Sequence, residues 1–129
     1  MMTLNHLNLS VQDVLATSDF FTTYLGFQTT TPKPNAHLAV LTGPDGFLLV
    51  LMNRTLNEKG NSTYPDSFHI GFYLPDEAAV TATYERLLQS PAILDQAPQR
   101  IRKTFGFYFT VDDIMVEITT PIQTSIPTA

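Results

Sequence analysis

The sequence FHIGFYLPD at residues 68–76 sets the fold, because LNHLNLSVQD at residues 4–13 has the same pattern. In both stretches apolar and polar residues alternate, which is typical of a strand that is buried on one face. Each strand is followed by an aspartate that is suited to cap the N-terminus of a helix. His6 and Asp13 both recur 63 residues later, as His69 and Asp76. The sequence therefore predicts two copies of one strand–helix unit.

The residues that follow each aspartate extend the repeat. Apolar side chains recur at helical spacing in both copies. Gly26 is suited to end the first helix, and Ser90–Pro91 ends the second. Turn residues separate the remaining strands, notably GPDG at 43–46 and the segment Val111–Asp113. The strands expected after the helices cover residues 27–30, 37–42 and 47–53 in the first copy, and 93–96, 103–110 and 114–119 in the second.

These elements predict an α+β protein that is built from two βαβββ modules. Module one covers residues 1–53 and module two covers residues 67–120. A polar linker with Gly and Pro spans residues 54–66, and a Thr/Pro-rich tail at 121–129 is expected to be loose. At 129 residues and 14.4 kDa, the whole chain is expected to form a single domain.

Composition excludes several classes of protein. The chain has no cysteine, which excludes disulfides, a thiol nucleophile and Cys-based metal sites. A net charge of −5 argues against nucleic-acid binding. The longest apolar run, Phe47 to Met52, is too short to span a membrane. No basic segment precedes an apolar stretch at the start, so no signal peptide is expected. We expect a cytoplasmic protein that binds small molecules.

Three residues could carry chemistry: His6, His69 and Glu117. Each lies on a predicted strand, on the face opposite the apolar residues that would pack under a helix. Two imidazoles and one carboxylate suit a divalent metal and leave coordination positions free for water or substrate. Taken singly, each of these residues has an ordinary alternative as a hydrogen-bonded or solvated strand residue. His37 has no counterpart in the repeat and is expected to have the ordinary role.

Aligning the two hairpin turns shows a departure from the repeat. If Asp45–Gly46 corresponds to Asp112–Asp113, then Val50 corresponds to Glu117. A valine side chain cannot bind a metal. The first copy therefore lacks the carboxylate that the second copy has.

These motifs together resemble the vicinal oxygen chelate superfamily, which includes glyoxalase I, bleomycin-resistance proteins, fosfomycin-resistance thiol transferases and type I extradiol dioxygenases. The resemblance covers about residues 4–119. Its carriers are LNHLNLSV (4–11), FFTTYLGF (20–27), GPDGFLLVLM (43–52), FHIGFYLPD (68–76) and FTVDDIMVEI (109–118).

The resemblance implies that each module forms a curled mixed sheet, with a metal in the cleft. Family ligands come from the first and last strands of each module, which here places them at His6, Val50, His69 and Glu117. The valine argues against classical glyoxalase activity. The remaining His/His/Glu set is similar to that of extradiol dioxygenases and fosfomycin-resistance enzymes. The implied cofactor is a divalent metal, namely Fe, Mn, Zn or Ni.

Two tyrosines are candidate catalytic residues. Tyr73 is expected to share the face of His69, and Tyr108 is expected to turn to the same side of the sheet. Either phenol could donate a hydrogen bond to a substrate oxygen or to an oxyanion. Equally, each could be an amphipathic aromatic side chain that lines a pocket.

Three functions follow from the resemblance. The first is a metal-dependent enzyme, a lyase or a dioxygenase, whose small substrate chelates the metal through two oxygens. The second is a metal-free protein that sequesters a small ligand, as bleomycin-resistance proteins do. The third, thiol transfer of the fosfomycin type, is disfavoured because the tail after Glu117 lacks basic residues to hold a phosphonate. Members of this size are commonly homodimers, with the modules paired within one chain or across two.

Overall fold

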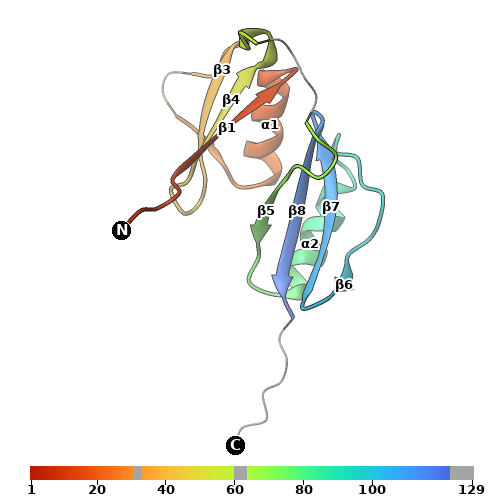
Figure 1. Cartoon of the computed structure of the whole chain (residues 1–129). Helices are drawn as coiled ribbons and strands as arrows, with labels where there is room; N and C mark the ends of the chain where they lie inside the picture. Colours follow the sequence, from red (N-terminus) through yellow and green to blue (C-terminus); the bar gives the residue numbers. More distant parts are fainter. Residues whose placement is uncertain (31–32, 60–63, 123–129) are drawn as a thin grey trace, which may run out of the picture. The chain divides into compact units, whose positions relative to one another are not determined.

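The computed structural model describes residues 1–30, 33–59 and 64–122. The chain divides into two compact units, Met1–Thr63 and Tyr64–Ala129. Figure 1 draws both units, each with one α-helix against a sheet. Most of the tail predicted to be loose lies outside the described residues.

The first unit has the order βαβββ. Its sheet is mixed, with the strand order β1-β4-β3-β2, and β1 runs parallel to β4 while the other pairs are antiparallel. A short 3₁₀ helix, η1 (Arg54–Leu56), follows the last strand. The bounds of the other elements are β1 (His6–Val11), α1 (Val14–Tyr24), β2 (Gln28–Thr29), β3 (Leu38–Thr42) and β4 (Leu48–Asn53).

The second unit repeats this topology. Its strand order is β5-β8-β7-β6, and again the first strand runs parallel to the last one while the other pairs are antiparallel. The predicted α+β class with two βαβββ modules is confirmed, and the sheets are curled but not closed. The elements are β5 (His69–Tyr73), α2 (Glu77–Leu87), β6 (Gln99–Ile101), β7 (Thr104–Val111) and β8 (Ile114–Pro121).

Both helices begin where the sequence predicts. The Asp13 carboxylate accepts a hydrogen bond from the backbone N–H of Ala16 at 3.0 Å, and that of Asp76 accepts one from Ala79 at 2.8 Å. Each cap satisfies a backbone donor that the first helical turn leaves unpaired. The first helix ends before Gly26, whose φ of 76° is a conformation that glycine adopts without strain.

Each unit has its own apolar core between one helix and one face of its sheet. The side chains that alternate inward along the strands are almost fully buried, as the sequence pattern predicts. In the second unit Tyr84 of α2 packs edge-on against Phe107, with ring centroids 5.3 Å apart. The core residues of the first unit include Leu9, Val11, Val14, Phe21, Leu41, Leu49 and Leu51, and those of the second include Val80, Leu87, Phe107, Phe109, Val116 and Ile118.

One predicted strand is wrong. Residues 93–96 contribute a single bridge, between Ile93 and Thr110, and the edge strand is instead β6. The chain reverses between Ile101 and Thr104, which pair with each other, and Arg102 has a φ of 57° within the turn. Because this tight turn lets the residues immediately before it pair with β7, the ladder forms there rather than further upstream.

The turn predicted at residues 111–113 joins β7 to β8 as a two-residue hairpin. Asp112 and Asp113 have φ values of 48° and 61°, and the flanking residues Val111 and Ile114 pair with each other. Positive φ at both central residues is typical of the turn that matches the twist of a two-residue hairpin. The turn fixes the register of β7 against β8, and so decides which residue faces Glu117.

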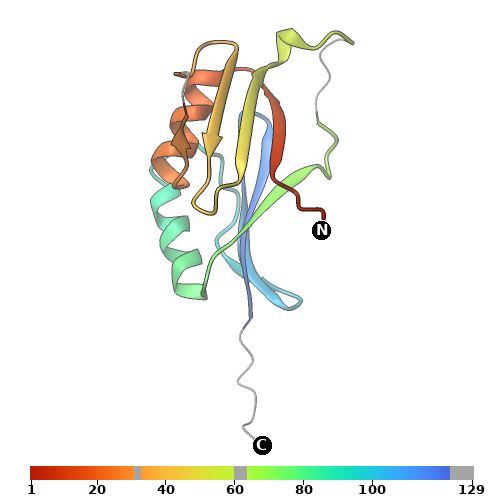
Figure 2. The ribbon, with the colours of Figure 1, turned by 90° about the vertical axis from the view of Figure 1, so that its left-hand side faces the viewer.

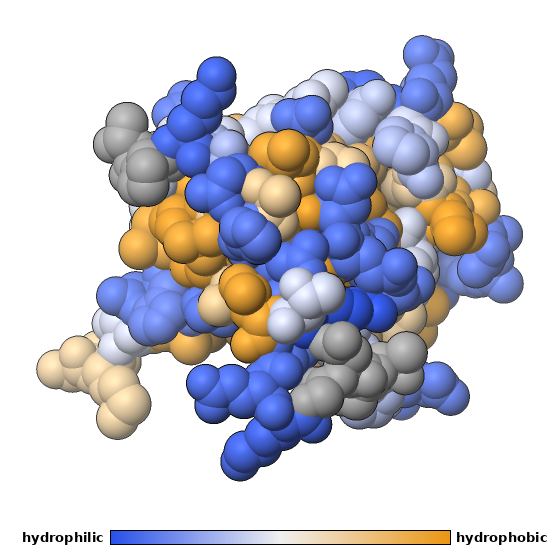
Figure 3. Space-filling view, turned by 90° about the horizontal axis from the view of Figure 1, so that it is seen from above, coloured by the Kyte–Doolittle hydropathy of each residue, from blue (hydrophilic) through white to orange (hydrophobic). Residues whose placement is uncertain are grey.

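In residues 1–30, 33–59 and 64–122, no helix is long and apolar enough to cross a membrane. The backbone view of Figure 2 shows both helices as short elements. In the face drawn in Figure 3, hydrophobic side chains are interspersed with hydrophilic ones.

Candidate functional site

The helix-free face of the second sheet carries the polar candidates. Helix α2 packs against β7 and β8, where the buried side chains of Phe107, Phe109 and Val116 face it. Because successive side chains on a strand point to opposite faces, the residues between them lie on the other side of the sheet. His69, Tyr108 and Glu117 are on this helix-free face.

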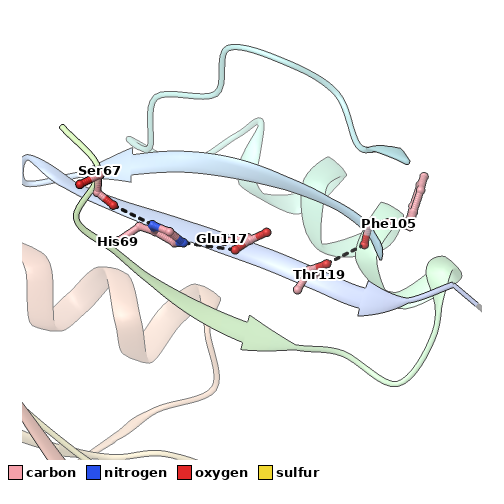
Figure 4. Close-up of polar contacts among 5 residues, drawn as sticks. All are labelled: Ser67, His69, Phe105, Glu117 and Thr119. Carbon is pink, nitrogen blue, oxygen red and sulfur yellow. Dashed lines mark hydrogen bonds and ion pairs between the residues drawn. The ribbon is translucent and has the colours of Figure 1, made fainter. Parts of the chain in front are cut away.

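His69 and Glu117 lie side by side. The imidazole Nε2 is 3.4 Å from the carboxylate Oε1, and the two side chains are 38% and 25% exposed. Figure 4 shows the imidazole of β5 pointing toward the carboxylate of β8. In the ladder Glu117 is opposite Gly71, and His69 is opposite Met115. The imidazole, two residues before Gly71, meets the carboxylate diagonally across the ladder.

The other ring nitrogen of His69 is fixed by the main chain. Nδ1 lies 3.0 Å from the carbonyl oxygen of Ser67, as Figure 4 also shows. A carbonyl oxygen accepts hydrogen bonds and cannot donate them, so Nδ1 carries a proton and donates. In a neutral ring, Nε2 then presents a lone pair to an anionic oxygen. The repulsion between this lone pair and the Glu117 oxygen is relieved either by a second proton on Nε2 or by a cation near both atoms. The pair therefore fits a divalent metal, for which neutral imidazole and carboxylate are ordinary ligands.

Tyr108 completes the cluster. It lies opposite Glu117 in the β7–β8 ladder, and its hydroxyl hydrogen-bonds to the Glu117 side chain. Its ring meets the imidazole of His69 edge-on, with centroids 5.7 Å apart and planes at 75°. Burial, the hydrogen bond to Glu117 and the negative charge of Glu117 together raise the pKa of Tyr108. The neutral phenol therefore persists to higher pH than usual and donates to the carboxylate.

The other tyrosine is not part of this cluster. Tyr73 is 74% exposed and pairs with Thr119, whereas His69 pairs with Met115. At the rise of a strand, the four steps from His69 to Tyr73 span about 13 Å. The face is shared, as predicted, but the second unit does not bring Tyr73 to the His69–Glu117 pair.

His6 lies in the first unit, at a position equivalent to that of His69. It begins β1 opposite Leu48, and two residues later Asn8 is opposite Val50. The second unit has the same register, with Glu117 in place of Val50. The ladders thus reproduce the correspondence that the turns suggest. Nδ1 of His6 lies 2.7 Å from the side-chain oxygen of Asn5.

The helix-free face of the first sheet is apolar at its centre. Leu48, Val50 and Met52 alternate along β4, and Val40 of β3 is opposite Val50. Among the described residues, no group of three or more His, Asp or Glu side chains gathers closely enough to hold a metal ion. The second unit thus holds two of the predicted ligands as a pair, and the third predicted ligand, His6, lies in the first unit.

The sequence did not predict the contacts that the Nδ1 atoms of His69 and His6 make with Ser67 and Asn5. The carbonyl of Ser67 gives no signal in the sequence because any residue supplies one. Asn5 does give a signal, since a side-chain amide directly before a candidate histidine is able to bind its ring. The hydrogen bond from Tyr108 to Glu117 follows from strand register, which depends on the Asp112–Asp113 turn.

The comparisons with known proteins agree with this architecture. The family model described as the Glyoxalase/Bleomycin resistance protein/Dioxygenase superfamily matches residues 3–121. A possible glyoxalase from Bacillus cereus has a solved structure with a TM-score of 0.74 and 29% identity, covering 92% of this chain and 98% of that one. No curated protein matches the chain.

Two more distant structures share the fold. A glyoxalase/bleomycin resistance protein/dioxygenase family enzyme from Burkholderia phytofirmans has a TM-score of 0.81 and 16% identity, covering 94% of this chain and 100% of that one. A lactoylglutathione lyase from Agrobacterium tumefaciens has a TM-score of 0.72 and 16% identity, covering 93% and 94%.

Proposed function

Because the chain belongs to the glyoxalase/bleomycin resistance protein/dioxygenase superfamily, we propose that it is a metal-dependent enzyme acting on a small substrate that offers two neighbouring oxygens. His69 and Glu117 are the ligands from the second unit, and His6 is the third. The observation that carries the proposal is the approach of His69 Nε2 to Glu117 Oε1 at 3.4 Å while Nδ1 is held by a main-chain carbonyl. The metal is Fe, Mn, Zn or Ni in the divalent state.

The donor set favours an open, reactive centre. Two imidazoles and one carboxylate leave positions free for water or for a chelating substrate, whereas structural sites usually close at four protein ligands. A divalent ion held there would act as a Lewis acid that stabilises negative charge on a substrate oxygen. The reaction would then be of the lyase or the dioxygenase type.

The side chains around the ligands have separate roles in this proposal. The Ser67 carbonyl keeps a proton on Nδ1 of His69, so that the Nε2 lone pair faces outward. Tyr108 donates to Glu117 and so restrains the carboxylate. Because its hydroxyl proton is committed to Glu117, Tyr108 acts through the carboxylate as a positioning residue. Tyr73, which is exposed on the same face, is the candidate for direct contact with substrate.

Metal analysis of protein purified without chelator tests the proposal. The wild-type chain should carry about one ion per chain, and the double variant His69→Ala/Glu117→Ala should carry none. The double variant His37→Ala/Glu85→Ala is a matched control, because it removes one imidazole and one carboxylate elsewhere and should keep the ion. A wild-type chain that remains metal-free after incubation with each of the four ions would contradict the proposal.

A second candidate function rests on the apolar centre of the first sheet. Val50 stands where the second unit has Glu117, and Leu48 and Met52 flank it on the same face. Such a face suits the apolar body of a small ligand, as in metal-free sequestering proteins. Binding of an apolar dye that is weakened by Val50→Glu, in a chain that binds no metal, would favour this function over the first.

Thiol transfer of the fosfomycin type has less support. Arg100 of the edge strand β6 is exposed and forms an ion pair with Glu77 at 3.4 Å. Its charge is therefore partly neutralised. Cells that overproduce the chain should gain no protection from fosfomycin. Survival on fosfomycin would favour thiol transfer over the other two functions.

A further inference from the structure

Both candidate histidines use Nδ1 to bind an oxygen. In the second unit the oxygen is the Ser67 carbonyl at 3.0 Å, and in the first unit it is the side-chain Oδ1 of Asn5 at 2.7 Å. An amide oxygen only accepts hydrogen bonds, so Nδ1 of His6 is the donor. The neutral ring of His6 therefore has its lone pair on Nε2, as does that of His69.

Asn5 is itself held in place. Its backbone carbonyl accepts a hydrogen bond from the N–H of Leu48 at 3.0 Å, and Leu48 is the ladder partner of His6. The residue thus sits at the first rung between β1 and β4. Its side chain meets the imidazole from a backbone position that the sheet fixes.

The contact changes which nitrogen can bind a cation. A neutral imidazole in water prefers to carry its proton on Nε2, and a protonated Nε2 has no lone pair to give to a metal. A hydrogen bond that requires the proton on Nδ1 reverses this preference and orients the ring. For His69 the main chain provides this hydrogen bond, whereas for His6 a side chain provides it, and that side chain can be replaced.

We propose that Asn5 is a positioning residue, which holds His6 in the Nδ1–H tautomer and leaves Nε2 open to a divalent cation. The inference rests on the proposed function for the role of the cation, but the tautomer itself belongs to the metal-free protein. It can therefore be tested before any metal is added.

The first test is long-range ¹H–¹⁵N correlation spectroscopy of the metal-free protein at about pH 9, where imidazoles are neutral. The chain has three histidines, so the rings can be assigned by single substitution. His6 should show the Nδ1–H pattern in the wild type and shift toward Nε2–H in Asn5→Ala. Asn5→Asp, which keeps an acceptor oxygen, should restore the pattern. His69 is the internal control and should not change in either variant.

The second test is the affinity for Zn(II), measured by competition with a coloured chelator. Asn5→Ala should bind roughly tenfold more weakly, at the low end of the effect of losing a hydrogen-bond partner of a ligand. Asn5→Asp should bind as well as the wild type or better. A His6 tautomer that is the same in wild type and Asn5→Ala would overturn the inference, and so would an affinity that does not follow the tautomer. A wild-type chain that binds no zinc would overturn the proposed function, while the spectra would still decide whether Asn5 holds the ring.

Discussion

Tyr108 lies directly opposite Glu117 in the β7–β8 ladder and hydrogen-bonds to its carboxylate. Burial comes first among the causes that raise the pKa of Tyr108, followed by this hydrogen bond and by the charge of Glu117. Two of these three causes depend on Glu117. The phenol therefore reports on the state of the carboxylate.

Glu117→Gln should lower the pKa of Tyr108 toward its ordinary value, because the substitution removes the negative charge that opposes ionisation. The absorbance of tyrosinate, followed against pH, measures the effect, and subtraction of Tyr108→Phe isolates this phenol from the other four tyrosines. A titration of Tyr108 that is identical with Glu and Gln at position 117 would contradict the contact.

The same shift makes stability depend on pH at the alkaline end. Because the folded chain holds the Tyr108 proton to higher pH than the unfolded chain, the stabilisation is complete below the unfolded pKa of about 10 and is lost as pH rises through the folded pKa. Tyr108→Phe should cost about 1 kcal/mol in the free energy of unfolding at neutral pH, the loss of one hydrogen bond. Urea unfolding should show that this difference shrinks above about pH 10. A difference that stays constant would argue against the raised pKa.

Metal binding should stabilise the fold through the ligand pair. At a free ion concentration one hundred times Kd, the gain in the free energy of unfolding is about 2.7 kcal/mol. Thermal unfolding should show a higher Tm on adding Mn(II) or Zn(II) to the wild type and to His37→Ala, and no change for His69→Ala. Equal shifts in His69→Ala and wild type would place the ion elsewhere.

Mixing two variants that each lack one ligand should reveal whether His6 binds the ion of its own chain or that of a partner chain. If the third ligand comes from a second copy of the chain, His6→Ala mixed with Glu117→Ala forms hybrid dimers in which one site is intact and the other lacks both residues. Metal binding then returns in the mixture. If each site draws on a single chain, both variants are defective in every dimer, and the mixture binds no more metal than its components. Light scattering of the wild type checks that dimers form at all.

Two glycines on the helix-free face of the second sheet should respond differently to alanine. A Cβ at Gly106 would collide with the Ile118 carbonyl oxygen and lie 2.9 Å from Thr119 Cα, both of them backbone atoms. A Cβ at Gly71 would meet Glu117 Oε1 at 3.8 Å, an ordinary contact. Denaturant unfolding should show a loss of more than about 3 kcal/mol for Gly106→Ala and a change below about 1 kcal/mol for Gly71→Ala. Similar values for the two would contradict the close approach at Gly106.

Local patterns were enough to predict most of the fold. The strand alternation around His6 and His69 and the caps at Asp13 and Asp76 are confirmed because each depends on residues close in sequence. The edge strand was misplaced because its position depends on the Arg102 turn, where a non-glycine residue adopts positive φ. Nothing in the residues 93–96 themselves indicates that pairing moves downstream.

The candidate site was predictable in part. That His69, Tyr108 and Glu117 share a face follows from counting residues along strands. That His69 approaches Glu117 depends on the parallel register of β5 against β8, and that Nδ1 is occupied depends on the Ser67 carbonyl, which no side chain signals. The apolar face around Val50 is an observation of the structure, because the burial pattern along β4 alternates and places Leu48, Val50 and Met52 on one side.

Val50 and Glu117 hold the same rung of the same ladder in two copies of one topology. The two units share one backbone topology, but the first has an apolar side chain at this position and the second has a carboxylate. Each chain therefore has a carboxylate at only one of these two equivalent positions. A Val50→Glu substitution would place a carboxylate at the second of these positions, as a starting point for designing a second metal site.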